Sequence, residues 1–274
     1  MKKFAYKNQQ LIEEKQAQVS IHERGFLFGD GIFETCKIFN GKIYNFKAHE
    51  ARIQSGLKAL KFCAEISDLE KKSLQLIAKN KIKNGVLRIS ISRGIGSEGY
   101  LPTYKSKPLI IIRAFNSKSV TQKIILGISK IKKPPSNSFP IQHKTMQGLI
   151  YTLNKISAQE QKFFDCVMLT QENFISETSS ANIFWVKNEE IFTPSNSCDI
   201  LLGTIRAKLL SNKNLKIKKV KMKISELKKA DEIFLTNTSF LALSVNEFAG
   251  RKLKNKIGKE ILEWLKSDVK SCNG

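Results

Sequence analysis

The sequence predicts a mixed α/β protein in two domains. Three observations predict it. Segments with the two-residue alternation of strands and the 3.6-residue period of helices follow one another along the 274 residues. The dipeptide Asn40-Gly41 is typical of a two-residue hairpin turn. A polar stretch at 115–122 separates two patterned halves. We therefore expect an N-terminal α/β domain over 1–114, a linker over 115–122 and a C-terminal domain over 123–274.

The first half predicts a small sheet with two helices. Strands are expected at 32–39 and, after the hairpin turn, at 42–46. A helix is expected from His49, and Ser67-Asp68-Leu69-Glu70 fits a capping box that opens a second one. Further strands are expected at 87–91, where Arg88, Ser90 and Ser92 would share one face, and at 108–114.

The second half alternates in the same way. Strands are expected at 124–129, 167–170, 182–186, 191–193, 232–236 and 241–248, and helices at 203–210 and 257–270. A further helix is expected soon after Lys144, with Met146, Leu149, Leu153 and Ile156 on its inward face.

Composition is that of a folded protein, because 41% of the residues are hydrophobic and 26% are charged. No apolar run approaches the roughly 18 residues of a membrane span, and the first residues lack the apolar stretch of a signal peptide, so we expect a cytoplasmic protein. The five cysteines are scattered and the three histidines share no ligand spacing. This pattern predicts neither a disulfide framework nor a metal site.

The formal net charge of +23 allows two interpretations. One is a nucleic-acid or polyanion binder, and the other is a lysine-rich surface. The lysines are spread along the chain and no basic block is interleaved with aromatic residues, which favours the second. A non-enzymatic polyanion binder is kept as a remote alternative. In either case the charge attracts carboxylates and small anions.

Single motifs are weak, but their order along the chain is informative. Arg24-Gly25 and the run from Phe28 to Thr35 are followed by His49-x-x-Arg52, Lys144, the run from Glu177 to Trp185, Thr193-Pro194, the run from Gly203 to Arg206, and the run from Asp231 to Thr238. This ordered set resembles the class IV aminotransferase family, the fold-type IV pyridoxal-phosphate enzymes, and within it aminodeoxychorismate lyase. The resemblance covers about residues 20–250.

The resemblance implies an α+β fold of two domains with mixed sheets and helices, like that of D-amino-acid aminotransferase. It implies a homodimer, and a cofactor-binding role for the C-terminal domain. Lys144 would hold pyridoxal 5′-phosphate as a Schiff base, and Glu177 would hold the ring nitrogen protonated. The cofactor's phosphate would lie where a helix begins, because free N–H groups there favour an anion. The residues implied for the phosphate are Arg52, Gly203, Thr204, Ile205, Asn237 and Thr238, with Ile205 at a position where many relatives have threonine.

The substrate is left between two reactions. Thr35, together with the stretches 84–94 and 181–185, resembles aminodeoxychorismate lyase, which converts 4-amino-4-deoxychorismate to 4-aminobenzoate and pyruvate in folate biosynthesis. Arg88 or Arg93 would bind substrate carboxylates, Phe33 would lie on the substrate side, and Thr35 would assist proton transfer. Glu98 stands where similar enzymes commonly carry arginine, and Gln147-Gly148 replaces a usual asparagine. The alternative is a transaminase acting on branched-chain or D-amino acids with 2-oxoglutarate.

Overall fold

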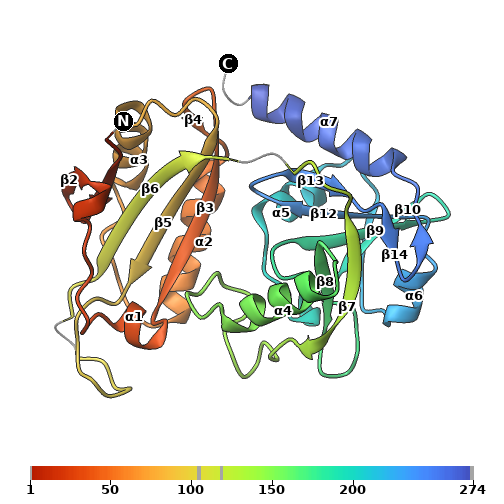
Figure 1. Ribbon diagram of the computed structural model, residues 1–274, viewed down its shortest axis with the longest axis horizontal. Coiled ribbons are helices and arrows are strands. Elements are labelled where there is room, and N and C mark those ends of the chain that lie inside the picture. Colours follow the sequence, from red (N-terminus) through yellow and green to blue (C-terminus); the bar gives the residue numbers. More distant parts are fainter. Residues whose placement is uncertain (1, 104–105, 118–119, 272–274) are drawn as a thin grey trace. The chain divides into compact units, whose positions relative to one another are not determined.

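The computed structural model describes residues 2–103, 106–117 and 120–271, and the chain divides into two compact units (Figure 1). The first unit comprises Met1–Lys118, His143–Gly148 and Val269–Gly274, and the second comprises Ser119–Gln142 and Leu149–Asp268. The division falls within the predicted linker, of which residues 118 and 119 lie outside the described part. The linker also begins later than predicted, since a strand continues to Asn116.

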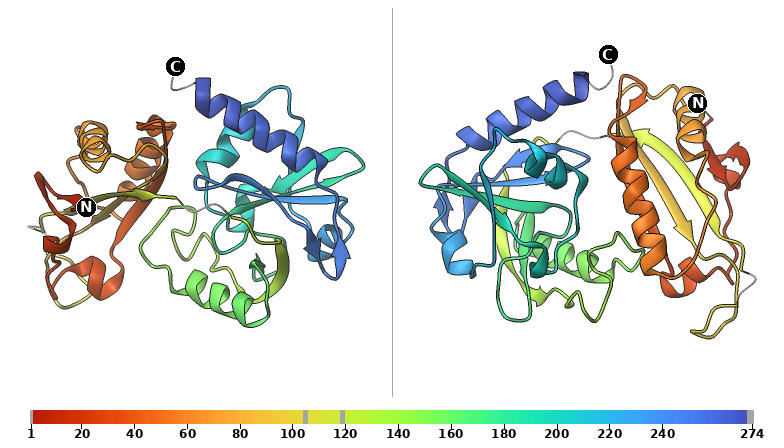
Figure 2. Two further views of the ribbon diagram at one scale, coloured as in Figure 1. Left: turned by 45° about the horizontal axis from the view of Figure 1, so that its top comes forward. Right: turned by 180° about the vertical axis from the view of Figure 1, so that it is seen from behind.

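A six-stranded antiparallel sheet forms the first unit, in the order β2-β1-β6-β5-β3-β4. Helices α2 and α3 cover one of its faces, as the left view of Figure 2 shows with the sheet nearly edge-on. The elements are β1 (Phe4–Lys7), β2 (Gln10–Glu13), η1 (Glu14–Gln16), α1 (Arg24–Phe28), β3 (Gly31–Phe39), β4 (Lys42–Ile43), α2 (Phe46–Ala59), α3 (Leu69–Lys79), β5 (Gly85–Ser92) and β6 (Leu109–Asn116).

The predicted hairpin after β3 forms, but its return strand is shorter than expected. Asn40 and Gly41 both have positive φ, 48° and 75°, as a two-residue hairpin turn requires. The expected strand 42–46 ends at Ile43, because Asn45 takes a left-handed conformation and α2 begins at Phe46. That helix therefore starts three residues before His49. Helix α3 begins at Leu69, but its N-cap is Asp68 in place of Ser67, and the Ser67 amide donates to Glu65 instead of Glu70, so the predicted capping box does not form.

Residues 143–148 belong to the first unit although they lie far along the chain. Thr145 forms a bridge with Ile32 on β3. The amide of Phe33 donates to the Lys144 carbonyl at 2.9 Å, and the amide of Met146 donates to the Gly31 carbonyl at 2.8 Å. These backbone bonds fix Lys144 beside the start of β3.

The second unit has a five-stranded sheet, in the order β11-β10-β9-β12-β13, and a four-stranded one, in the order β15-β14-β7-β8. One apolar core contains Leu126 and Val167 of the smaller sheet together with Ile183 and Leu235 of the larger. The strands are β7 (Ile125–Lys132), β8 (Asp165–Leu169), β9 (Asn182–Lys187), β10 (Glu190–Pro194), β11 (Ile217–Val220), β12 (Glu232–Asn237), β13 (Leu241–Ser244), β14 (Glu247–Phe248) and β15 (Arg251–Lys252).

Helices α5 and α7 lie over the larger sheet (Figure 1). Phe184 and Phe234 stack under them with ring centroids 5.0 Å apart, and Gly258 of α7 packs closely on Phe234. The helices of this part are α4 (Leu149–Glu160), η2 (Asn196–Cys198), α5 (Thr204–Ser211), α6 (Ile224–Lys228) and α7 (Lys256–Ser271). Within the described residues, no helix combines the length and apolar character that crossing a membrane requires.

Two expectations for this half are wrong. The apolar stripe of α4 does not point inward: Leu149, Leu153 and Ile156 are 69%, 47% and 49% exposed, and Asn154 is buried instead. The expected single strand 241–248 is two strands in different sheets, β13 and β14. A strand break after Ser244 lets the chain leave the larger sheet and join β7.

Candidate active site

Glu177 is a buried carboxylate that is held from three directions. Its Oε1 accepts from the Lys133 ammonium at 2.6 Å and from the Leu201 amide at 3.0 Å. Its Oε2 accepts from the Asn182 side-chain amide at 2.8 Å. The side chain is therefore fixed in orientation, and a carboxylate has room for one more hydrogen-bond donor.

Lys133 follows directly on β7, and its side chain is fully buried. Besides Glu177, its ammonium donates to the Tyr151 hydroxyl of α4 at 2.8 Å. Burial alone lowers the pKa of Lys133, but the charge of Glu177 and the bonds to both partners raise it further, so the net shift is upward. Lys133 is thus a buried cation beside the carboxylate.

The start of α5 presents polar groups with no partner. The Thr204 hydroxyl is buried at the first helical residue, and it has no hydrogen-bond partner in the described structure. The Thr236 hydroxyl near the end of β12, the strand on which α5 packs, is in the same condition. A helix start also offers free backbone N–H groups. Buried unpaired hydroxyls are unusual in proteins, and an oxyanion such as a phosphate would satisfy them.

Gly203 precedes this helix for a steric reason. A Cβ on Gly203 would lie 2.0 Å from Oδ1 of Asn182. Asn182 in turn donates to Glu177 and, at 2.9 Å, to the carbonyl of Leu201. The glycine therefore allows the start of α5 to lie directly against Asn182, the residue that donates to Glu177.

The remaining predicted phosphate residues of this unit differ in what they offer. The side chain of Asn237 closes the turn after β12, since it accepts from the amides of Ser239 and Phe240 and donates to the Ser180 carbonyl. Ile205 is buried and apolar. Thr238 is buried next to this turn. Ile205 has only backbone groups to offer a phosphate, and the Asn237 side chain has one N–H beyond those bonds.

In the first unit, the Lys144 side chain lies against the ring of Phe33 on β3. Its ammonium stands 4.4 Å from the ring centre of Phe33, and the Arg88 guanidinium stands 4.0 Å from the same ring centre. Arg88 is the direct cross-strand neighbour of Thr35. Because side chains alternate along a strand, Phe33 and Thr35 share the face of the sheet opposite Ile32, which packs on α2. Lys144, Phe33, Thr35 and Arg88 therefore form one cluster, the β3 cluster.

Arg88 differs from Arg93 in its partners. No carboxylate in the described part of the chain lies within ion-pair distance of Arg88, and burial together with the nearby Arg113 lowers the pKa of Arg88. Arg93 donates to Asp30 at 2.7 Å and to the Leu60 carbonyl at 2.7 Å. Arg88 thus has no acidic partner among the described residues, whereas Arg93 holds backbone and Asp30 in place.

Arg52 is bound to an acid on the helix-covered face. Its Nε and Nη2 donate to the two oxygens of Glu34 at 2.6 and 2.7 Å, and Nδ1 of His49 lies 2.7 Å from Glu34. Glu98, the departure from related sequences, is 87% exposed and lies 3.9 Å from the His22 ring.

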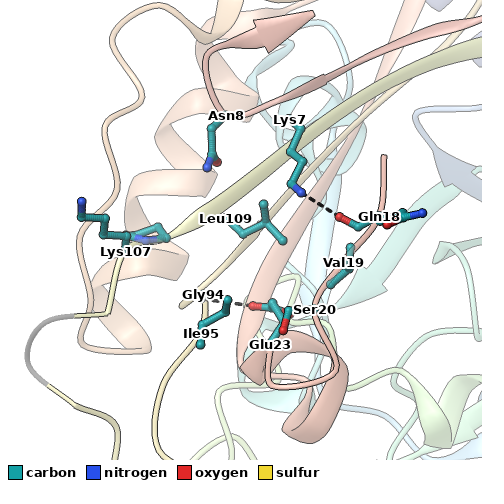
Figure 3. A pocket seen from close by; sticks show the side chains of 11 residues that line it. Lys7, Asn8, Gln18, Val19, Ser20, Glu23, Gly94, Ile95, Lys107 and Leu109 are labelled. Carbon is teal, nitrogen blue, oxygen red and sulfur yellow. Dashed lines mark hydrogen bonds between the residues drawn. The ribbon is translucent and has the colours of Figure 1, made fainter. Parts of the chain in front are cut away.

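A hollow of about 430 Å³ lies elsewhere in the first unit (Figure 3). Lys7, Glu23, Ile95 and Leu109 are among its lining residues. Lys7 donates to the Gln18 carbonyl, and Glu23 accepts from the Gly94 amide (Figure 3). None of the predicted site residues lines this hollow.

Comparison with known sequences decides the family. The family model described as amino-transferase class IV matches residues 31–248. This chain belongs to the class IV aminotransferase family. Enzymes of the family depend on pyridoxal 5′-phosphate, and the chain is accordingly an enzyme of transaminase or lyase type.

Relatives with different reactions are similarly distant. An aminodeoxychorismate lyase of Bacillus subtilis is 28% identical, over 85% of this chain and 82% of the relative. A D-alanine aminotransferase of Bacillus licheniformis is 25% identical, over 90% and 88%. Among solved structures, the branched-chain aminotransferase of the thermophilic archaeon Thermoproteus uzoniensis with norvaline has a TM-score of 0.92 at 20% identity, covering 98% of this chain and 95% of its own. The predicted fold type is confirmed, and the substrate is not decided.

Sequence reasoning missed Lys133, Tyr151 and Asn182. Asn182 lies within the run from Glu177 to Trp185, but the sequence predicts no role for it. Lys133 is one of 47 basic residues. Its only sequence signal is its place between a strand and Pro134-Pro135. Nothing in the sequence marks it as buried, since the burial depends on Glu177 and Tyr151 being brought to it.

Proposed function

We propose that this chain is an aminodeoxychorismate lyase that carries pyridoxal 5′-phosphate on Lys144. The observation that carries the proposal is the β3 cluster, in which a hydroxyl and a guanidinium of the β3–β5 pair and the Lys144 amine beside them gather around Phe33. The lyase reaction needs each of these groups: an amine to hold the cofactor, a proton donor for the leaving group, and a cation for a substrate carboxylate.

The second unit fits the rest of the cofactor. Glu177 has one acceptor position left for the ring nitrogen. The unpaired Thr204 hydroxyl and the N-terminus of α5 suit the phosphate. Arg52 is already paired with Glu34, so it would have to share its guanidinium to contact the phosphate. When bound, the cofactor supplies an electron sink for the substrate's amino group.

Lys133 is the competing amine, and its geometry argues against it. Its ammonium is 2.6 Å from Glu177, the carboxylate assigned to the ring nitrogen. In pyridoxal phosphate the ring nitrogen and the aldehyde carbon lie at opposite ends of the ring, roughly 4 Å apart by standard bond lengths. One lysine cannot touch the carboxylate and hold the aldehyde carbon at once. We therefore assign the aldehyde to Lys144.

Different residues of this chain would then carry out the proton transfers and the binding of the substrate carboxylate. Lys144 would hold the cofactor, and its amine would accept a substrate ring proton. The Thr35 hydroxyl delivers a proton to the departing enolpyruvyl group, which leaves as pyruvate. Arg88 binds a substrate carboxylate, with Phe33 holding the guanidinium by its ring face. The product is 4-aminobenzoate, an aromatic compound whose formation makes the step favourable.

A class IV transaminase is the second candidate, because the solved structures of this fold include branched-chain aminotransferases and the relatives include D-alanine aminotransferases. Both reactions use a lysine base and a ring-nitrogen acid. The difference is the co-substrate: a transaminase needs a keto acid to regenerate its cofactor, and the lyase does not.

The deciding experiment measures pyruvate release from 4-amino-4-deoxychorismate with no keto acid present. We expect catalytic release in the wild type. Thr35→Ser, which keeps the hydroxyl, should retain most of it, and Thr35→Val, of the same shape, should lose about 10²-fold. Turnover of branched-chain or D-amino acids that requires 2-oxoglutarate, with no pyruvate from the chorismate compound, would instead establish the transaminase.

Lys144 is tested by mass mapping of the borohydride-reduced, digested protein. We expect the cofactor adduct on the peptide that contains Lys144, and its loss in Lys144→Ala. Lys130→Ala is the matched control, because Lys130 is an exposed lysine on β7.

The homodimer and the cytoplasmic location stay predictions. Light scattering of the purified protein tests the first, and salt-sensitive retention on nucleic acid with no bound chromophore would favour the remote polyanion binder.

A further inference from the structure

The β3 cluster lies on the face of the six-stranded sheet opposite α2 and α3, and this face, the cluster face, carries a second arginine. Ile112 and Ala114 of β6 are buried on the helix-covered side, so Arg113 between them points to the cluster face. Arg113 is directly opposite Arg88 on β5, and Arg88 is directly opposite Thr35 on β3. Residues opposite one another on paired strands share a face. The three side chains therefore form one row across three strands.

Arg88 and Arg113 are a like-charge pair at a position where a sheet is destabilised by one. Side chains directly opposite each other have Cβ atoms about 5 Å apart, and equal charges there lower the stability of the sheet. Burial and the charge of Arg113 both lower the pKa of Arg88, because the two guanidiniums repel each other. Residues that cost stability in this way are expected at functional sites.

The acids around this pair do not balance its charge. Glu14 accepts from Nε of Arg113 at 2.6 Å, and Arg88 has no acidic partner among the described residues. On β3, β5 and β6, all of which are described, the only acid is Glu34, and it lies on the helix-covered face beside Arg52. One carboxylate thus serves two guanidiniums. Arg113 also has donors left beyond its bonds to Glu14, since a guanidinium carries five N–H groups.

The row begins at the groups assigned to the reaction. The Lys144 ammonium and the Arg88 guanidinium both lie on the ring of Phe33, and Thr35 is the next residue of β3 on that face. Neighbouring strands are about 4.8 Å apart, so the backbone of Arg113 is two strands, about 10 Å, from that of Thr35. A substrate that reacts at Lys144 and Thr35 therefore meets Arg88 first and Arg113 beyond it.

We propose that Arg113 is a substrate-binding residue which, together with Arg88, makes the site select substrates with two carboxylates. Arg88 binds one carboxylate, and Arg113 binds the other with the donors that Glu14 leaves. The two negative charges remove the repulsion between the guanidiniums, whereas a substrate with one carboxylate leaves one guanidinium unneutralised. This deepens the proposed function, because 4-amino-4-deoxychorismate has one carboxylate on its ring and one on its enolpyruvyl group, and it rests on that function in placing the substrate against the β3 cluster.

The test is a calorimetric titration of the purified holoenzyme with two unreactive compounds, 3-(carboxymethoxy)benzoate, which has two carboxylates, and 3-methoxybenzoate, which has one. We expect the wild type to bind the first about tenfold more tightly. In Arg113→Met this ratio should fall to near one. In Glu14→Gln, which removes the competing carboxylate, the ratio should rise by about threefold. The matched control is Lys58→Met, which removes an equal charge from an exposed position of α2 and should leave the ratio unchanged.

An unchanged ratio in Arg113→Met would overturn the proposal, and so would equally weak binding of both compounds by the wild type. If Arg113→Met does not fold, Glu14→Gln carries the test. A purely structural ion pair between Glu14 and Arg113 would lose stability in that variant with no gain in affinity for the dicarboxylate, and that result also overturns the proposal.

Steady-state kinetics separates this proposal from the lyase assignment. In Arg113→Met the KM for 4-amino-4-deoxychorismate should rise about tenfold with little change in kcat, because Arg113 stands two strands away from the proton donor. Pyruvate release with an unmoved KM and an unmoved binding ratio defeats only the role of Arg113. Absence of pyruvate release, together with a binding ratio that depends on Arg113, defeats the lyase and supports selection of a dicarboxylic substrate for another reaction.

Discussion

Several charged side chains of this protein are buried, and Glu34 is one of them. Its side chain is 1% exposed and contacts Arg52 and His49. Burial by itself raises the pKa of Glu34, but Arg52 and His49 lower it more, from 4.5 to about 2. A carboxyl whose pKa is lowered by folding stabilises the folded state above its unfolded pKa. That stabilisation is lost as the pH falls through the folded value.

We therefore expect Glu34 to contribute about 3 kcal/mol to the free energy of unfolding at neutral pH, and this contribution should disappear between about pH 5 and pH 2. The measurement is the urea midpoint as a function of pH for the wild type and Glu34→Gln. The variant should be less stable at pH 7, where Arg52 is left unpaired, and the two proteins should converge in acid. Parallel curves would show that another carboxyl carries the acid sensitivity.

At the scale of single residues, the sequence predicted Glu177 as a site residue but not Lys133. Glu177 could be assigned because it lies in an ordered motif that the family shares, and the structure places it among fixed donors. Lys133 could not be assigned, because a lysine's burial is a property of its tertiary neighbours and leaves no local pattern. Whether Lys144 holds the cofactor stays a prediction, which mass mapping tests.

At the scale of elements, strand alternation predicted well and helix faces did not. The strands β3, β5 and β9 were predicted to within two residues at each end, because hydrophobic alternation reflects a sheet covered on one or both faces. The stripe on α4 was predicted as core since it has helical spacing, yet it is exposed. Spacing shows that one face is apolar. It does not show what covers that face.

The exposure of this α4 stripe leads to a stability prediction. Leu153→Gln should change the free energy of unfolding by less than about 1 kcal/mol, as exposed substitutions do. Leu209→Ala in α5, where the side chain is fully buried, should cost about 2–5 kcal/mol. Urea denaturation of both variants checks this. A loss from Leu153→Gln as large as that from Leu209→Ala would mean that another surface covers α4 in solution.

The junction of β9 and α5 gives a second prediction for this scale. In Gly203→Ala the new methyl group would lie against Oδ1 of Asn182, so Asn182 must move and release Glu177 or Leu201. We expect a loss of about 1–3 kcal/mol in stability and weaker cofactor binding. Gly99→Ala is the control, because a Cβ there meets nothing within 4 Å. Cofactor affinity equal to that of the wild type would show that Asn182 is not needed to hold Glu177.

For the whole molecule, the question is how a chain with a net charge of +23 distinguishes its cofactor from any other phosphate. A ligand that binds only the folded state stabilises it by mass action, about 2.7 kcal/mol at a free concentration one hundred times its Kd. Surface lysines would give some of this effect with any phosphate. A covalent bond to one lysine would stabilise the folded state further, and this additional stabilisation would require the cofactor's aldehyde.

We therefore expect pyridoxal 5′-phosphate to raise the urea midpoint of the cofactor-free protein more than pyridoxine 5′-phosphate, which has the same ring and phosphate but no aldehyde. In Lys144→Ala the two compounds should stabilise equally, because only non-covalent contacts with Glu177, the α5 terminus and the cationic groups are left. Lys130→Ala should behave as the wild type. If the aldehyde advantage persists in Lys144→Ala and vanishes in Lys133→Ala, the cofactor is attached to the buried lysine, and the acid for the ring nitrogen must then be a residue other than Glu177, since Glu177 and Lys133 lie at the same point of the site.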